Sequence, residues 1–248
     1  MIVFKVLLLF AVGAVAGFLN VLAGGGSFLT LPVLIFMGLP PTVANGTNRV
    51  AIFMQNVVAV KKFHDYRVFP LRFALLVVLP AVCGSILGAY SATIIADAVF
   101  KKILALLMVG ITLLSMSDTT RGLEKREVKI TGFRWVLIIL IFFAIGFYGG
   151  FVQAGVGFLI LSAMVLTGFD FVEANAVKVF VILIFTVFAL IIFTLQHKVN
   201  YLWGLVLGCG NVLGAYTAAA AAVKKGNRFV QKVVFAAIVV MALKLLFG

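Results

Sequence analysis

Long apolar runs separated by short polar loops dominate this chain. Residues 6–48 contain no charged residue. As one helix they would measure about 65 Å, roughly twice the hydrocarbon thickness of a bilayer. The run must therefore cross twice, or cross once and re-enter. The pattern predicts one break at the three successive glycines 24–26 and a second at the Gly-Leu-Pro-Pro turn 38–41, because these residues disfavour a continuous helix.

The rest of the chain follows the same pattern. Residues 135–169 form a second charge-free run, broken near Gly155 and Gly157. The shortest segments are expected at 28–37 and 158–167. Residues 1–17 resemble a signal peptide, but a first membrane helix is the preferred interpretation because the second half contains an internal counterpart. Further apolar segments are predicted at 44–60, 73–96, 98–116, 177–196, 201–223 and 229–247.

The two halves of the chain match each other. A shift of 130 residues superposes glycines and the Ala-Asn pair, and a shift of 126 superposes a Gly-Ala-Tyr triplet. We therefore predict an all-α polytopic membrane protein with two inverted repeats of about five apolar segments, at 1–117 and 135–248, joined by a basic cytoplasmic linker loop at 118–134. The matched residues are Gly25 with Gly155, Gly38 with Gly168, Asn45 with Asn175, and Gly88-Ala89-Tyr90 with Gly214-Ala215-Tyr216.

Positive charge places the linker loop inside the cell. Most Lys and Arg residues lie in the 61–72, 117–134 and 224–228 loops, which share one side if there are ten crossings, and the linker loop is cytoplasmic with ten crossings or with eight. The two models differ in the side of the termini. Ten crossings are preferred, because they also place the 224–228 cations inside.

Composition excludes the soluble classes. The chain is 65% hydrophobic and 11% charged, against about 45–50% and about 25% in soluble domains. Its net charge of +13 lies in short loops, which argues against nucleic-acid binding. Two cysteines within apolar segments indicate neither disulfides nor a metal site. No catalytic motif, metal cluster or cofactor motif is present, so we expect no enzyme, no metal and no cofactor.

The glycine breaks are the first candidate for a binding site. A helix broken inside a membrane leaves backbone groups that protein, water or a ligand must satisfy. A helix that restarts there directs free N–H groups at the gap, which favours an anion. Close packing of helices is the alternative. The residues assigned to this candidate are Gly24, Gly25, Gly26, Ser27, Gln153, Gly155 and Gly157.

Two cations form the second candidate. Arg49 and Lys178 follow Asn45 and Asn175, which are good N-cap residues, so each cation should lie within the first turns of a helix. A helix N-terminus disfavours a cation, and an anionic substrate would compensate. The alternative is that both side chains extend to the lipid headgroups. The candidate also includes the neutral side chains of Thr47 and Asn48.

Acidic side chains are missing from the middle of every segment. All seven acids and both histidines lie in loops or at segment ends. Cation carriers and proton-coupled carriers commonly keep a carboxylate there. The pattern therefore disfavours a cation substrate and a proton carried on a buried acid.

These motifs together resemble the TauE/SafE-type sulfite exporter family of bacterial membrane permeases. The resemblance rests on 16–17, 23–27, 31–34, Gly38 and 44–48, while the second copy is degenerate. It implies transport of sulfite, organosulfonates or related small organic anions across the bacterial inner membrane. A non-transport assembly or scaffold subunit that binds a partner protein is the alternative. The expected partners are the lipid bilayer and a small anion, and assembly into a homo-oligomer stays open.

Overall fold

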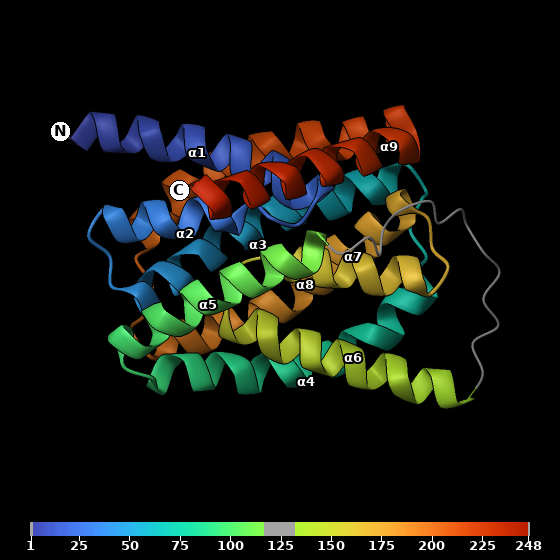
Figure 1. Cartoon of the computed structure of the whole chain (residues 1–248), viewed down its shortest axis with the longest axis horizontal. Helices are drawn as coiled ribbons and strands as arrows, with labels where there is room; N and C mark the ends of the chain where they lie inside the picture. Colours follow the sequence, from blue (N-terminus) through green and yellow to red (C-terminus); the bar gives the residue numbers. More distant parts are fainter. Residues whose placement is uncertain (1, 117–131, 248) are drawn as a thin grey trace.

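The computed structural model describes residues 2–116 and 132–247, and within them every regular element is a helix (Figure 1). The predicted all-α fold is thus confirmed. Most of the predicted linker loop, residues 117–131, lies outside the described residues. The helix α9 is two helices that meet at a kink at Gly226. The helices are α1 Ile2–Leu22, α2 Ser27–Phe36, α3 Pro41–Asp65, α4 Leu71–Ile94, α5 Asp97–Met116, α6 Gly132–Phe151, α7 Val156–Leu166, α8 Phe171–Leu195 and α9 Tyr201–Phe247.

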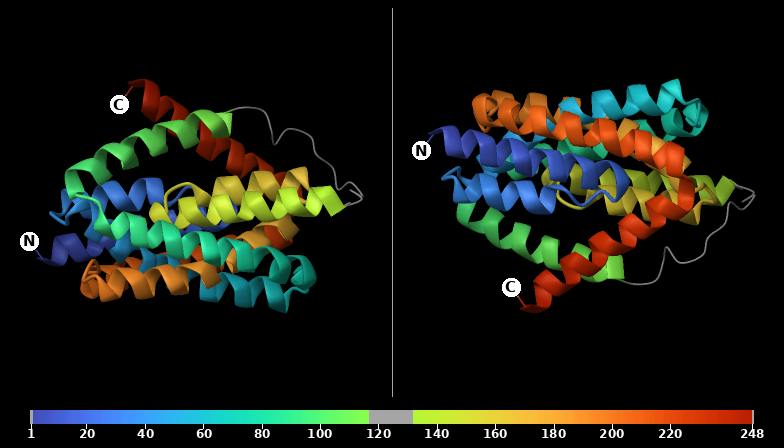
Figure 2. Two further views of the ribbon diagram at one scale, coloured as in Figure 1. Left: turned by 90° about the horizontal axis from the view of Figure 1, so that it is seen from below. Right: turned by 90° about the horizontal axis from the view of Figure 1, so that it is seen from above.

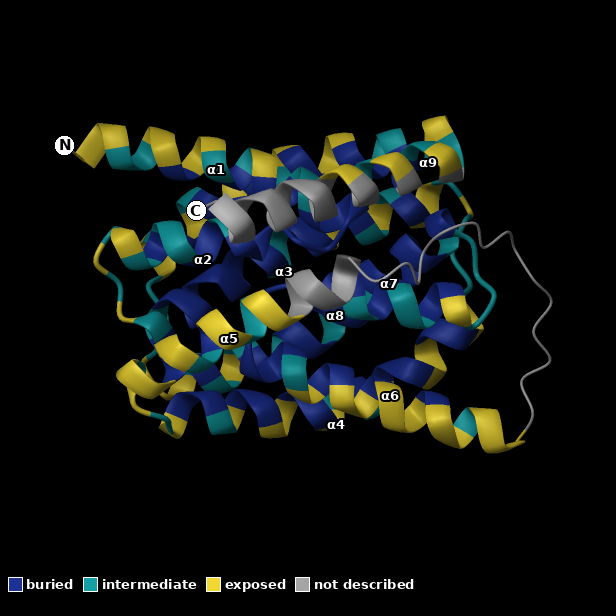
Figure 3. Ribbon diagram, viewed as in Figure 1, coloured by how far each residue is buried: buried dark blue, intermediate teal, exposed yellow. Residues whose placement is uncertain are grey.

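The surface and interior have the polarity expected of a membrane protein. Large apolar side chains such as Leu79 and Leu140 are more than half exposed on the outer faces of α4 and α6, whereas many amides and hydroxyls are buried (Figure 3). Five helices are long and apolar enough to cross a bilayer: α1, α4, α6, α8 and the Tyr201–Gly226 part of α9. The chain is therefore a multi-pass membrane protein.

The two short helices do not cross. With 10 and 11 residues, α2 and α7 measure about 15 and 17 Å, about half of a hydrocarbon core. Each folds back from the end of its predecessor, so that α1–α2 and α6–α7 are helical hairpins whose tips lie inside the bundle (Figures 1 and 2). The preference for ten crossings over eight stays a prediction, and α2 and α7 are too short to make full crossings of their own.

The ends of the helices still follow the alternation of a ten-segment chain. The N-terminus and the last turn of α9 lie at one end of the bundle (Figure 1). The connection between α3 and α4, the start of α6 and the bend in α9 lie at the other. The helices α1 and α6 run in opposite directions, as an inverted repeat requires.

Glycine-mediated contacts join α1 to α9 and α6 to α4 in the same way. At each contact a Cβ added to the glycine would lie within about 2.5 Å of a backbone oxygen of the neighbouring helix, so no larger residue fits without a shift. These matched contacts favour the predicted repeat, which stays a prediction together with its boundaries. They are Gly13 with Leu207, Gly17 with Asn211, Gly210 with Phe10 and Gly214 with Ala14, and correspondingly Gly146 with Ala81, Gly150 with Ser85, Gly84 with Phe143 and Gly88 with Phe147.

Corresponding turns in the two halves of the chain also have the same backbone conformation. The turns after α2 and α7 contain Gly38 and Gly168, with φ of 101° and 95°. The turns after α3 and α8 contain Arg67 and His197, with φ of 57° and 54°, the described non-glycine residues with positive φ. Both pairs are related by the shift of 130 residues found in the sequence.

A first prediction concerns the α4–α6 contact. In Gly84→Ala the new Cβ would lie 2.1 Å from the Phe143 carbonyl oxygen, and we expect overpacking to lower the free energy of unfolding by about 1–3 kcal/mol. The matched control is Gly110→Ala in α5, whose Cβ meets no described atom within 4 Å. Thermal unfolding in detergent, followed by tryptophan fluorescence, measures both. Equal unfolding temperatures for the two variants would contradict the close contact.

Candidate functional site

The tips of the two hairpins touch at the centre of the bundle. A Cβ added to Gly24 would lie 2.4 Å from Cα of Gly157 in the opposite tip. Gly24 and Gly155 also have positive φ, 88° and 75°, which glycine adopts without strain. Both breaks therefore need glycine for their turns and for the approach of the two backbones. The helices that restart, α2 and α7, have no side-chain hydrogen bond at their N-caps.

Lys178 reaches from α8 to the end of α1. It is fully buried, and Nζ donates hydrogen bonds to the carbonyl oxygens of Asn20 (3.0 Å) and Val21 (2.7 Å) and to Oδ1 of Asn175. Three acceptors match the three hydrogens of an ammonium group. Asn20 and Val21 belong to the last turn of α1, where carbonyls lack helical partners and the helix dipole favours a cation.

Arg49 makes the corresponding contact from α3 to the end of α6. It is fully buried, with Nη1 donating to Oε1 of Gln153 at 2.9 Å and Nη2 donating to the carbonyl oxygen of Gly150. Its guanidinium carbon lies 4.7 Å from the ring centre of Phe193. Its Nε has no partner. Each half of the chain thus supplies a cation that binds carbonyl oxygen at the broken helix of the other half.

This arrangement corrects two expectations. Asn45 and Asn175 are not N-caps: α3 begins at Pro41, because proline suits the first helical position, and α8 is capped by Asp170, which accepts from two backbone N–H groups. Both cations therefore lie in the third turn of their helices. Neither extends to the headgroups, because both are fully buried among backbone carbonyls.

The asparagines instead support the breaks. Asn45 donates to the carbonyl oxygen of Phe151 at 2.9 Å and accepts from N–H of Gln153. Asn175 accepts from Lys178 and donates to the carbonyl oxygen of Phe171 within its own helix. Both side chains therefore bind backbone or a buried cation, and they keep the neighbouring polar groups paired.

The remaining predicted residues either lie in the hairpin tips or bind neighbouring segments from α3. Asn48 accepts from Thr30 at 2.8 Å and donates to Ser27 at 3.1 Å, which fastens the start of α2 to α3. Thr47 accepts from N–H of Asn200 in the turn before α9. Gly26 is packed against α1, where a Cβ would lie 2.0 Å from a carbonyl oxygen, and Gly25 and Gly155 are buried in the tips.

A small cavity lies between the two tips and the helices α3 and α8. Its volume is about 10 Å³, room for about one water molecule. Five predicted residues line it, whereas Arg49 lies behind Gln153. Asn20, Gln55 and Asn56 also line it; they are amides within apolar segments, which is the one sequence signal that could have identified them. The polar and glycine lining residues are Gly24, Ser27, Gln153, Gly157 and Lys178, with Asn20, Gln55 and Asn56.

The amides around this cavity form an incomplete network. Gln55 accepts from Asn20 at 3.3 Å and from Asn211 at 2.9 Å. Nδ2 of Asn56 is buried and has no partner. The buried polar residues of the described chain include Arg49 and Lys178 but no Asp or Glu. The site therefore combines two buried cations and a free donor, with no carboxylate among the described residues that line the cavity.

Comparisons with known proteins identify a family and several probable membrane transporter proteins as relatives. The model of the family described as sulfite exporter TauE/SafE matches residues 9–245. A probable membrane transporter protein of Haemophilus influenzae is 30% identical over 97% of this chain and 94% of its own length. The probable membrane transporter proteins ORF9 of Sinorhizobium and YfcA of Escherichia coli K12 are each 30% identical over 96% of this chain and cover 91% and 88% of their own lengths. No solved structure matches. The chain belongs to the TauE/SafE sulfite exporter family.

Proposed function

We propose that this protein is a secondary transporter that moves a small oxyanion, such as sulfite, an organosulfonate or a related carboxylate, across the bacterial inner membrane. One observation carries the proposal: two buried cations lie beside a cavity where two membrane hairpins meet, and no carboxylate is among the described residues that line this cavity. The family description and the names of the relatives support the same class. In a region of low dielectric constant, an anion is the natural partner for this excess charge.

In this proposal Lys178 is the charged ligand, because it lines the cavity. Its three hydrogens already have acceptors, so an anion must replace or share one of them. That exchange is favourable, because a hydrogen bond between two ions is stronger than one to a neutral carbonyl. Asn56 supplies a donor that is free before the anion arrives.

Arg49 acts on the anion indirectly in this proposal. Both terminal nitrogens are bound, to Gln153 and to the end of α6, so the guanidinium offers no free fork to an anion in this state. It holds Gln153, which lines the cavity, and its charge raises the local potential. We therefore propose Arg49 as a positioning residue, with direct contact only after a rearrangement.

The cavity must enlarge before it can hold an oxyanion. We propose that the two halves, 1–117 and 135–248, form an inverted repeat around the site and that the hairpins α1–α2 and α6–α7 move relative to α3 and α8. If the two hairpins moved in turn, the site would open first to one side of the membrane and then to the other.

Transport by the protein alone is the decisive test. Purified protein in liposomes should accumulate labelled sulfite or methanesulfonate when a gradient is imposed, whereas a Lys178→Ala protein should show little flux. If the parent protein binds either anion but moves none, the alternative of a non-transport assembly subunit is favoured.

Substitution of the two cations should separate their roles. Lys178→Ala removes a charge-assisted contact worth about 1.5–3 kcal/mol, and we expect sulfite affinity to fall roughly ten- to a hundredfold. Arg49→Lys keeps the charge but loses the contact through two nitrogens, so sulfite affinity should fall less than in Lys178→Ala. The affinity of Arg49→Ala should lie between those of Arg49→Lys and Lys178→Ala.

Calorimetry with sulfite measures these affinities, and exposed Lys102→Ala provides the matched control. Unfolding temperatures without sulfite identify variants that merely fold poorly. If both Lys178→Ala and Arg49→Ala bound sulfite as tightly as the parent, the anion site would have to lie elsewhere.

A further prediction concerns coupling. Because no carboxylate is among the described residues that line the cavity, proton coupling should not depend on a single acid there. Each single neutralisation should leave gradient-driven flux, measured in the same liposomes. Loss of proton-linked flux with intact binding in any one variant would refute this prediction. The variants are Asp65→Asn, Asp97→Asn, Asp118→Asn, Glu124→Gln, Glu127→Gln, Asp170→Asn and Glu173→Gln.

A further inference from the structure

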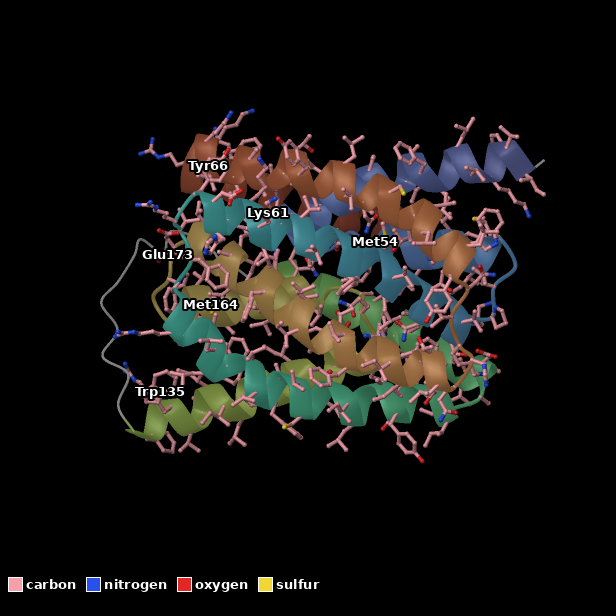
Figure 4. The ribbon with its side chains drawn as sticks, turned by 180° about the vertical axis from the view of Figure 1, so that it is seen from behind. Met54, Lys61, Tyr66, Trp135, Met164 and Glu173 are labelled. Carbon is pink, nitrogen blue, oxygen red and sulfur yellow. The ribbon has the colours of Figure 1, made fainter. Side chains whose placement is uncertain are left out.

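A second, larger hollow opens at the end of the bundle that holds the connection between α3 and α4. Its volume is about 530 Å³. The rim carries the exposed side chains of His64, Asp65 and Arg67, and apolar side chains including Val60 and Phe180 line it more deeply. Figure 4 shows Lys61 and Tyr66 at this end of the molecule, with Met54 farther along the same helix toward the middle.

One face of α3 lines both the hollow and the buried cavity. Ile52 and Asn56 line the cavity, and Val60 and His64 line the hollow. These four residues are spaced by four, so they form one stripe along the helix, about 6 Å apart from one to the next. The two spaces therefore follow each other along α3, separated by about one helical turn.

The helix α8 contributes to both spaces as well. Lys178 and Ile182 line the cavity, and Phe180, two residues from each and therefore on the opposite face of α8, lines the hollow. The ring of Phe180 packs edge-on against that of Phe69 in the α3–α4 connection, with centroids 5.3 Å apart and planes at 79°. The floor of the hollow thus depends on an aromatic contact between α8 and a surface turn.

The hollow has the size and charge to admit an anion. Pockets that hold small molecules measure about 300–1,000 Å³. Arg67 at the rim and the exposed side chains of Lys61 and Arg72 nearby give this end a positive potential that concentrates anions. The cavity behind it has room for about one water molecule.

We propose that this hollow is the vestibule from which the anion enters the buried site, and that Val60, one turn beyond Asn56 on α3, forms the barrier between them. The proposal rests on the proposed function and adds its access route. Movement of the Val60 side chain away from Asn56 would join the two spaces. In this state the site is closed, and the thin barrier faces the end that carries the α3–α4 connection.

Thiol labelling tests the access route without any substrate. In a background of Cys83→Ser and Cys209→Ser, Val60→Cys should react with an anionic, membrane-impermeant methanethiosulfonate at least about tenfold faster than Val57→Cys. Val57 is the matched control, because it lies one turn away on α3 but is 45% exposed on the outer surface, where lipid would cover it. Arg67→Cys marks the side of the membrane from which labelling must occur.

A second measurement tests the barrier. Ile52→Cys lies in the closed cavity and should react slowly, and adding Val60→Ala should accelerate its reaction on the order of tenfold. Val57→Ala, on the same helix but 45% exposed on the outer surface, should leave the rate unchanged. Unfolding temperatures of both double variants exclude general loosening as the cause.

Two results would overturn the proposal. One is labelling of Val60→Cys no faster than Val57→Cys, or from the side opposite to Arg67→Cys. The other is an Ile52→Cys rate that Val60→Ala does not change. Failure of the proposed function is distinguishable, because liposomes that move no anion would refute transport while the labelling rates remain as expected.

Discussion

The structure depends on how two helices are allowed to end inside a membrane. A helix that stops there leaves up to four carbonyl oxygens without helical partners, and lipid can satisfy none of them. Here a buried cation from the other half of the chain binds each end: Lys178 at the end of α1 and, through Gly150, Arg49 at the end of α6. The carbonyls stabilise the charge and the charge satisfies the carbonyls, so neither cation needs a carboxylate.

This interaction determines the rest of the site. Since the cations hold the helix ends, the tips of both hairpins lie at the centre of the bundle, where Gly24 and Gly157 touch. Asn45 and Asn48 then fasten the ends of α6 and the start of α2 to the same helix, α3. The result is a small region with excess positive charge, surrounded by amides. In the proposed function, this charge favours an anion over a cation.

In the proposed transport cycle, the same interaction allows the hairpins to move. Carbonyl oxygens are neutral acceptors, and an anion can replace one at Lys178 without leaving the ammonium unpaired. A carboxylate partner would hold the cation far more tightly and would have to be displaced with its charge. Each hairpin is also anchored differently along its length. Its long helix packs tightly by glycine contacts on α9 or α4, while its short helix ends at a buried tip.

The amino-acid sequence by itself determined the class of the protein and most of the chemical groups of the site. Composition required a bilayer, successive glycines required breaks, and the repeated Ala-Asn and Gly-Ala-Tyr motifs indicated two related halves. These features are local, so the periodicity and residue types suffice to recognise them. The cations and the missing acids were equally visible, because a charge inside an apolar run needs no structure to be noticed.

Only the tertiary structure decided what each group contacts. The two backbone carbonyl oxygens that accept from Lys178 lie more than 150 residues away in α1. The cavity-lining amides Asn20, Gln55 and Asn56 look like ordinary interhelical polar residues until α1, α3 and α8 are brought together. Helix starts were also decided there, since proline at Pro41 and the cap at Asp170 extended α3 and α8 beyond the asparagines that had seemed to begin them. Contacts between distant segments follow from packing and from the need to satisfy buried backbone groups, and neither is a property of a single stretch of sequence.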